Sequence, residues 1–231
     1  MSLGGDRLFG NDNALTGGVG YFRGKKVLLL GIDKGKNTND RILRNFGMAR
    51  PEGYRKAIRL MELANRFNLP VLTFIDTAGA YPGKGAEERG QAQAIASCVD
   101  ASLKLNTPMI STILGEGGSG GAIALTSGNV ILMFEHSIFS VISPEGCASI
   151  LWRDASKANE AAKALKLTAK DMKKLNIIDE IIQEPLGGAH RDYDKSLTLL
   201  GDSIELQLNE LLKLDPQELK IIKQSKYLKI T

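Results

Sequence analysis

The chain has very few of the residues that hold metals or form disulfides. Its 231 residues include two cysteines, two histidines and one tryptophan. Cys98 and Cys147 lie far apart in helix-like surroundings, and neither forms a metal-ligand spacing with His136 or His190. We therefore expect no metal in this chain and a reducing compartment.

Long apolar runs are also missing. No run approaches the ~20 residues that cross a bilayer, and the opening Met-Ser-Leu-Gly-Gly-Asp lacks the charged and apolar regions of a signal peptide. With 43% hydrophobic and 24% charged residues, the composition is that of an ordinary globular protein. No stretch has the composition of a linker, so we expect one cytoplasmic domain over residues 1–231 and no membrane partner.

Positive charge is gathered in one place. The formal net charge is only +4, but residues 33–59 carry eight basic and three acidic side chains, a local surplus of five. Such a surplus would raise the local concentration of an anionic partner. A solvated helix face is the alternative for about half of these positions. Aromatic residues do not alternate with the charges, so nucleic acid is not expected.

Short apolar strands alternate with helical segments along the chain. Residues 16–22 and 26–33 form a predicted hairpin, and Pro51 suits the first turn of a helix that runs to about Phe67. The other predicted elements are strands at 70–75, 108–114, 130–134, 138–142 and 177–183, helices at 86–104, 122–127, 144–152, 156–165 and 168–175, and C-terminal helices within 192–231, including a surface helix at 213–229 with Asp215 as N-cap. This alternation predicts an α/β fold with a parallel sheet and right-handed crossovers.

Two glycine-rich loops follow neighbouring strands of the predicted sheet. The first covers residues 78–83, and the second covers 115–121, which reads Gly-Glu-Gly-Gly-Ser-Gly-Gly. Ligands of parallel sheets bind beyond the carboxyl ends of the strands, so we expect the loops to lie side by side. Glycines let backbone N–H groups approach a ligand, and a helix N-terminus adds unpaired donors. The pair predicts a site for a phosphate or for a reaction's oxyanion, with a mere tight turn as the alternative.

The second loop also satisfies a hydrolase pattern. Residues 117–121 match G-x-S-x-G, the nucleophile elbow, between a strand and a helix. Asp179 and His190 follow in the order that a triad with Ser119 needs. A glycine-rich turn with one serine produces this short pattern by accident, so a serine hydrolase is an alternative. A non-catalytic module that uses the glycine loop only as an anion site for phosphates is another.

Eight segments carry a specific resemblance. They are Arg44–Gly47, Pro51–Ala57, Phe74–Thr77, Gly79–Gly83, Gly85–Gln91, Gly115–Ala122, Ser140–Trp152 and Glu184–Arg191. Together they resemble the carboxyltransferase α-subunit family of bacterial acetyl-CoA carboxylases, from Gly5 to about Arg191. The resemblance implies a crotonase-like (Clp protease/crotonase) spiral of ββα units. It also implies transfer of a carboxyl group from carboxybiotin to acetyl-CoA, which makes malonyl-CoA for fatty acid synthesis.

The resemblance further implies partners and site residues. An α subunit of this family pairs with a β subunit in an α2β2 heterotetramer, works with the biotin carboxyl carrier protein and biotin carboxylase, and is active only with β. As the half that grips biotin, it would aim backbone amides at the ureido oxygen: those of Gly120 and Gly121, with Gly79 or Ala80 opposite. The neighbouring biotin contacts would be Gly117, Gly118, Ser119 and Tyr81. Because the biotin nitrogen can take the methyl proton of acetyl-CoA, no side-chain base is required.

Two departures from the family pattern matter. The family usually has proline where this chain has Ala78, and proline carries no N–H, so the donor in the first loop is expected at Gly79 or Ala80. The family also carries a helical N-terminal region that is missing before Gly5. We therefore expect a truncated chain, with residues 1–3 as an expression scar. That loss puts assembly with β in question, but not the core fold.

Overall fold

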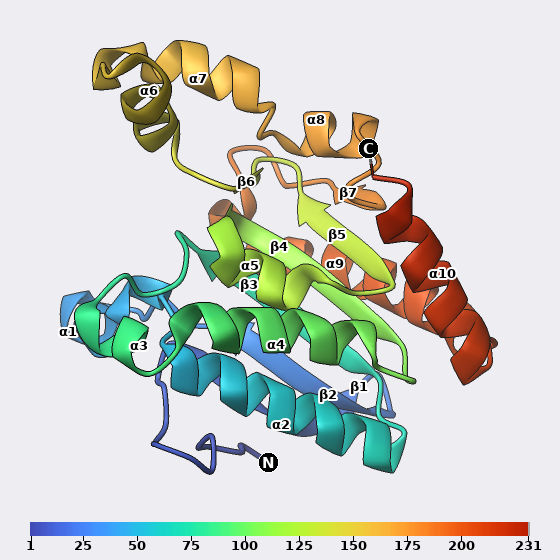
Figure 1. Cartoon of the computed structure of the whole chain (residues 1–231). Coiled ribbons are helices and arrows are strands. Elements are labelled where there is room, and N and C mark those ends of the chain that lie inside the picture. The colour runs from blue at the N-terminus through green and yellow to red at the C-terminus, as the bar shows by residue number, and fades with distance from the viewer. Residues whose placement is uncertain (231) are drawn as a thin grey trace.

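One mixed sheet runs through the molecule, with helices on both of its faces (Figure 1). The computed structural model describes residues 1–230. The strands are β1 (Leu15–Phe22), β2 (Lys25–Ile32), β3 (Val71–Thr77), β4 (Met109–Gly118), β5 (Val130–Phe134), β6 (Ile138–Ser140) and β7 (Glu180–Ile182). Their order is β1-β2-β3-β4-β5-β7, and β6 pairs with the last residues of β4. Only β1 and β2 are antiparallel, so the predicted parallel sheet is confirmed from β2 onward.

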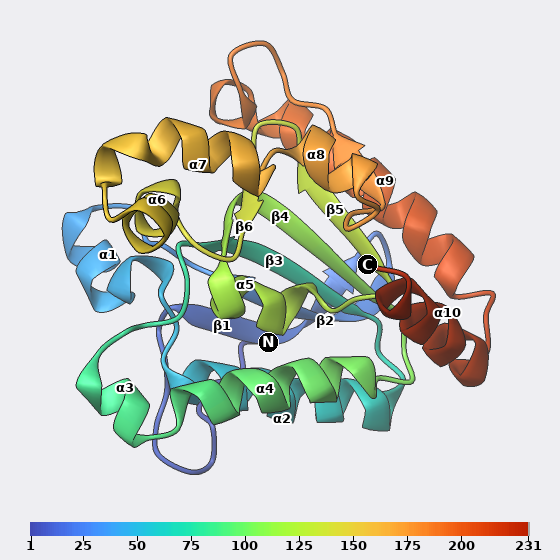
Figure 2. The ribbon, with the colours of Figure 1, turned by 45° about the horizontal axis from the view of Figure 1, so that its top comes forward.

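Helices cover the sheet in two layers (Figure 2). They are α1 (Thr38–Leu43), α2 (Pro51–Phe67), α3 (Lys84–Glu88), α4 (Gln91–Leu103), α5 (Ser119–Thr126), α6 (Pro144–Trp152), α7 (Ala158–Leu165), α8 (Ala169–Lys174), α9 (Tyr193–Leu211) and α10 (Pro216–Leu228), with 3-10 turns at Asn45–Gly47, Ala155–Lys157 and Ala189–Arg191. Helices α2, α4 and α5 pack on one face, and α9 packs on the other. Helices α6 and α7 project as a pair beyond β6 (Figure 1).

Alternate residues of the central strands enter two different cores. Leu28 and Val71 pack with α2, α4 and α5 in one cluster. Their chain neighbours Val27 and Leu72 pack with α9 in the other. Side chains alternate across a strand, so a sheet that is covered on both faces needs apolar residues at successive positions. This explains why the central strands are continuous apolar runs in the sequence.

Residues at the turns and helix starts explain the local structure there. Arg23 and Gly24 both have positive φ, 46° and 81°, as a type I′ hairpin turn requires. Pro51 occupies the first turn of α2. The hydroxyls of Ser143 and Thr168 accept hydrogen bonds at the starts of α6 and α8. At α10 the Asp215 carboxylate forms a capping box.

Several of the predicted elements have different bounds in the structure. The strands predicted at 138–142 and 177–183 are shorter, at Ile138–Ser140 and Glu180–Ile182. The helix predicted over 86–104 is two helices, because Gly90 adopts φ 79° and separates α3 from α4. The second glycine loop is largely strand: Gly115 to Gly118 extend β4 and pair with β6 and Thr77. Helix α5 then begins at Ser119 rather than at Ala122.

The C-terminal helix α10 lies on the surface, as the sequence predicted, but two residues of its inner face are buried. Leu219 and Lys223 of α10 are buried, and Lys223 is 0% exposed. The Lys223 ammonium donates to the Ser102 carbonyl at 2.8 Å, and the Tyr227 hydroxyl contacts the Thr126 and Gly128 carbonyls. Helix α10 therefore packs against the ends of α4 and α5.

The basic segment 33–59 contacts other parts of the chain. Arg44 pairs with Asp33 and Asp40, and the Arg59 guanidinium donates to the Gly4 and Gly5 carbonyls. Lys34, Arg50, Arg55 and Lys56 also have polar partners within the protein. Most of these basic residues therefore have partners within the protein, and an anionic partner for the segment stays a prediction.

Membrane and metal signals are both missing from the described chain. Within residues 1–230 no helix is long and apolar enough to cross a bilayer. Over the same residues, His, Cys, Asp and Glu form no group of three that could hold a metal ion. Cys98 and Cys147 are free thiols, and burial raises the pKa of Cys98 to about 12, which makes that thiol unreactive.

Candidate active site

The two glycine-rich segments lie against each other, as predicted. They follow β3 and β4, which pair in parallel. A β-carbon built on Gly121 would lie 2.6 Å from both the Ala80 nitrogen and the Gly79 carbonyl carbon, and one on Gly118 would collide with the Ala78 carbonyl. Only glycine permits backbone segments to approach this closely.

The four predicted amide donors differ in whether they are already hydrogen-bonded. The Ala80 N–H, which lies outside the helices and strands, donates to no other group within residues 1–230. Gly120 and Gly121 belong to the first turn of α5, which has no side-chain cap, and first-turn amides have no helical acceptor. The Gly79 N–H, in contrast, donates to the Thr77 hydroxyl at 3.1 Å. Ala80 is therefore the free donor of the first loop.

The other predicted contact residues fall into different environments. Gly117 is buried in the ladder between β3 and β6, so its N–H and carbonyl lie within the sheet. Gly118 is the N-cap of α5. Ser119 is half-buried with φ 53°, a conformation that is rare for a residue with a side chain. Tyr81 is half-buried, and its ring centroid lies 4.6 Å from the Arg50 guanidinium.

A buried tyrosine lies beneath the free amides. The Tyr54 hydroxyl would be 2.9 Å from a β-carbon on Gly121, and the side chain is 0% exposed. Its hydroxyl has no hydrogen-bond partner within the described residues. Burial raises the pKa of this phenol, so it keeps its proton. From the sequence, Tyr54 is expected only as core or interface packing, and its place under the site follows from the approach of α2 to the loop.

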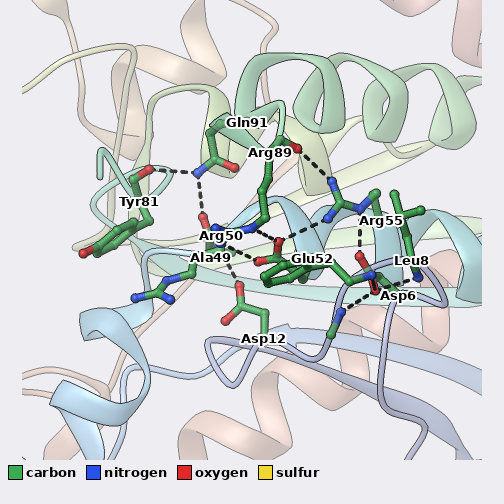
Figure 3. Close-up of polar contacts among 12 residues, drawn as sticks. Asp6, Leu8, Asp12, Ala49, Arg50, Glu52, Arg55, Tyr81, Arg89 and Gln91 are labelled. Atoms are coloured by element: carbon green, nitrogen blue, oxygen red, sulfur yellow. Dashed lines mark hydrogen bonds and ion pairs between the residues drawn. The ribbon is translucent and has the colours of Figure 1, made fainter. Parts of the chain in front are cut away.

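Gln91 holds the first loop from the start of α4 (Figure 3). Its side-chain amide donates to the Ala49 and Tyr81 carbonyls, both at 2.9 Å, and the Tyr81 N–H donates to the same Ala49 carbonyl at 3.0 Å. Gln91 is only 3% exposed. The residue after Ala80 is thus fixed through both its N–H and its carbonyl. Sequence reasoning missed this contact, because it joins three segments that are distant along the chain.

A buried ion-pair network ties the first residues of the chain to α2 (Figure 3). Glu52 accepts from Arg89 at 2.6 Å and from Arg55 at 3.2 Å. Asp6 accepts from Arg55 and from the amides of residues 8–10. Burial alone would raise the pKa of Glu52, but the hydrogen bond from Arg89 and the two guanidinium charges outweigh it and lower the pKa. The network fixes the loop before β1 against α2 and the α3–α4 junction.

A charged trio joins the carboxyl ends of three strands. The Lys34 ammonium lies 2.8 Å from Asp76 and 3.0 Å from Glu116. Asp76 also accepts the Glu116 N–H at 3.0 Å. Burial lowers the pKa of Lys34, but the two carboxylates outweigh it and raise the pKa. The trio keeps the strand ends next to the glycine segments in register.

The structure contradicts the serine-hydrolase alternative. The Asp179 carboxylate accepts the Ile131 N–H and pairs with Lys226 at the other end of the sheet. His190 lies in a 3-10 turn, where its ring is near Gly188. Neither side chain has a contact with Ser119, so the three residues form no triad.

Comparison with known proteins identifies the family. Residues 1–231 match the family described as acetyl co-enzyme A carboxylase carboxyltransferase-like. The acetyl-coenzyme A carboxylase carboxyl transferase subunit alpha of Caulobacter sp. (strain K31) is 59% identical over 220 residues, which cover 95% of this chain and 69% of that protein. The subunit of the same name from Methylobacterium nodulans is 58% identical over 228 residues, 99% of this chain and 72% of that one.

Solved structures of low sequence identity share the fold. The Pseudomonas malonate decarboxylase MdcD-MdcE hetero-dimer superposes with a TM-score of 0.75 at 15% identity, over 93% of this chain and 88% of that one. Transcarboxylase 12S, solved with methylmalonyl-coenzyme A bound, superposes with a TM-score of 0.66 at 18% identity, over 80% of this chain and 36% of that one. These neighbours confirm the crotonase-like α/β fold. By sequence, the chain belongs to the family of acetyl-CoA carboxylase carboxyltransferase α subunits, and it is a carboxyltransferase component.

Proposed function

We propose that this chain supplies the biotin-gripping half of a carboxyltransferase that moves the carboxyl group of carboxybiotin to acetyl-CoA and so makes malonyl-CoA. The observation that carries the proposal is the approach of Ala80 to Gly121, which brings the free Ala80 amide and the first-turn amides of α5 to one place. Two such donors on different segments can bind one oxygen from two directions. In this proposal that oxygen is the ureido oxygen of biotin.

The chemistry needs donors of this kind. When its carboxyl group leaves, biotin accumulates negative charge on the ureido oxygen, and its ring nitrogen can take the methyl proton of acetyl-CoA. The amides of Ala80, Gly120 and Gly121 are held by the backbone before the reaction, so they stabilise that charge with little reorganisation. Each such donor contributes roughly 3 kcal/mol in comparable sites. The dipole of α5 adds to the effect, because its N-terminus lies at the same place.

The fit of the residues to biotin is favourable. The donors are neutral amides, which suit an uncharged ring that becomes anionic only during the reaction. Tyr81 offers a half-buried aromatic ring beside them, and the Tyr54 phenol beneath them is neutral. Acetyl-CoA is the second substrate in this proposal, with its nucleotide bound mainly by the partner.

A β subunit of the same fold is the proposed partner, in an α2β2 assembly that also serves the biotin carboxyl carrier protein and biotin carboxylase. Helices α6 and α7 support this, because they project from the body (Figure 1) and α6 exposes large apolar side chains. Ile150 is 71% exposed and Leu151 is 64% exposed. Neighbouring exposed apolar side chains of this size are typical of an interface. The cytoplasmic location also stays a prediction.

Reconstitution tests the proposal. The chain is assayed for malonyl-CoA formation from acetyl-CoA and carboxybiotin, with and without the β subunit. We expect turnover only with β. Turnover by this chain alone would contradict the proposal that the active site needs both subunits. Biotin protection of the 79–80 amides from hydrogen exchange, which CoA alone does not give, would separate this proposal from a module that only holds CoA phosphates.

A further inference from the structure

Thr77 lies behind the candidate site and contacts the backbone of its first loop. It is the last residue of β3 and is only 1% exposed. Its hydroxyl lies 2.8 Å from the Gly79 carbonyl and accepts the Gly79 N–H at 3.1 Å. One side chain therefore binds both polar groups of Gly79, whose φ of 150° is accessible to glycine but not to residues with a side chain.

This contact sets the direction of the next amide. The peptide bonds of residues 1–230 include no cis bond, and in a trans peptide the carbonyl and the N–H point in opposite directions. The Gly79 carbonyl and the Ala80 N–H belong to the same peptide. When the carbonyl is bound by Thr77, the Ala80 N–H points away from Thr77 and is left without an acceptor inside the described chain. That is the donor needed at the site.

A second acceptor competes for the same proton. The Gly47 carbonyl also lies 2.8 Å from the Thr77 hydroxyl, and a hydroxyl has only one proton to donate. Gly47 ends a turn in which Asn45, Phe46 and Gly47 all have positive φ. The hydroxyl thus links this strained turn to the 79–80 peptide.

We propose that Thr77 is a positioning residue for carboxyl transfer, whose hydroxyl holds the Gly79–Ala80 peptide so that the Ala80 amide is presented to the oxyanion. The inference rests on the proposed role of the Ala80 and Gly121 amides. Thr77 does not touch substrate itself. Its effect is to keep the donor in place, and small displacements of such groups lower turnover strongly.

The test compares two threonines of the same strand. Thr77→Val removes the hydroxyl and keeps the shape. Thr73→Val is the matched control, because Thr73 is also buried in β3 and bonds a backbone carbonyl, that of Leu125, at 2.7 Å. In the complex with β, Thr77→Val should lower kcat roughly 10- to 100-fold with KM for acetyl-CoA unchanged. Thr77→Ser should restore kcat, and Thr73→Val should change only the melting temperature.

A double-mutant cycle separates positioning from general stability. Ala80→Pro removes the amide, and on that background Thr77→Val should cause no further loss of kcat. Additive losses, or normal kcat for Thr77→Val, would overturn the inference. Normal kcat for Ala80→Pro would instead overturn the proposed role of the amide. If Thr77→Val does not assemble with β, Thr77→Ala is judged by the same criteria, and failure of Thr77→Ser to restore kcat also counts against the proposal.

Discussion

Gly121 packs so closely on Ala80 that a β-carbon on the glycine would lie 2.6 Å from the alanine nitrogen. The same β-carbon would lie 2.6 Å from the Gly79 carbonyl carbon. Both obstacles are backbone atoms, which cannot move aside as the end of a flexible side chain can. The first loop must therefore shift if residue 121 gains a side chain.

Gly121→Ala should lower kcat on the order of 100-fold, the loss typical of removing one oxyanion donor. The loop would retreat and carry the Ala80 amide with it. Gly120→Ala is the control for stability, because its β-carbon would meet Ile95 at an ordinary 3.4 Å and alanine favours helix. We expect Gly120→Ala to melt no lower than the wild type. Normal kcat for Gly121→Ala would contradict the proposal that the Ala80 and Gly121 amides bind the oxyanion together.

Gln91→Leu should destabilise the protein. The Tyr81 carbonyl would lose its bond to Gln91, and the Ala49 carbonyl would keep only the Tyr81 N–H. A buried polar group left without a partner costs about 1–3 kcal/mol. Urea unfolding measures the change. Gln93→Leu on the same helix is the control, since Gln93 is exposed and bonds only Ser97. If Gln91→Leu and Gln93→Leu change the free energy of unfolding equally, Gln91 does not hold the first loop.

Glu52 should stabilise the protein at neutral pH and lose this effect in acid. Its pKa is lower in the folded state than in the unfolded chain. The contribution is therefore complete above the ordinary carboxyl pKa of 4.5 and disappears as the pH falls through the lowered value. Glu52→Gln should cost about 3–5 kcal/mol at pH 7, because Arg55 and Arg89 lose a buried partner.

The control for Glu52 is Glu88→Gln, which changes an exposed carboxylate in a pair with Lys84. We expect little change there. The free energy of unfolding of each protein is measured from pH 7 to pH 2. If the free energies of unfolding of Glu52→Gln and the wild type differ by the same amount from pH 7 to pH 2, the stabilisation by Glu52 does not depend on its ionisation.

Lys223 should make the protein more stable as the pH rises. Burial lowers the pKa of this ammonium to about 8, while the unfolded chain keeps the ordinary 10.5. Below pH 8 both states are protonated and the desolvation penalty is complete. Between the two values the folded state releases its proton first, so the penalty is relieved and the free energy of unfolding increases, by up to about 3 kcal/mol.

Lys223→Met removes this dependence and tests it. The difference in unfolding free energy between wild type and variant should move in favour of the wild type from pH 8 to pH 10.5. Lys229→Met, at an exposed position after α10, should follow the wild type over that range. If the free energies of unfolding of the wild type and Lys223→Met change in parallel with pH, the buried ammonium does not titrate in the folded protein over this range.

Much of the fold follows from local signals in the sequence. Pro51 and Asp215 predict where α2 and α10 begin, and Arg23-Gly24 predicts the hairpin turn, because each acts on its own backbone. Gly115 to Gly118 were predicted as loop because glycine is rare in strands. They extend β4 because β3 and β6 supply ladder partners on both sides.

The place of the candidate site could be predicted from the sequence, but the contacts that hold it could not. The glycine segments and the donors Gly120, Gly121 and Ala80 could be proposed from parallel strands and glycine spacing. Thr77 and Gln91 could not, since their importance lies in which distant carbonyl each reaches. The internal partners of the basic residues in segment 33–59 could not be predicted for the same reason. A sequence counts Lys34 as positive, but the fold places it between Asp76 and Glu116.

The packing of α9 has a consequence for how the polypeptide is made. One whole face of the sheet, including Val27, Leu72 and Ile110, is covered by residues that come after position 192. During synthesis from the N-terminus, those strands emerge from the ribosome long before their cover does. The nascent chain must therefore carry an open apolar face through most of translation, which is the period when it most needs protection from aggregation.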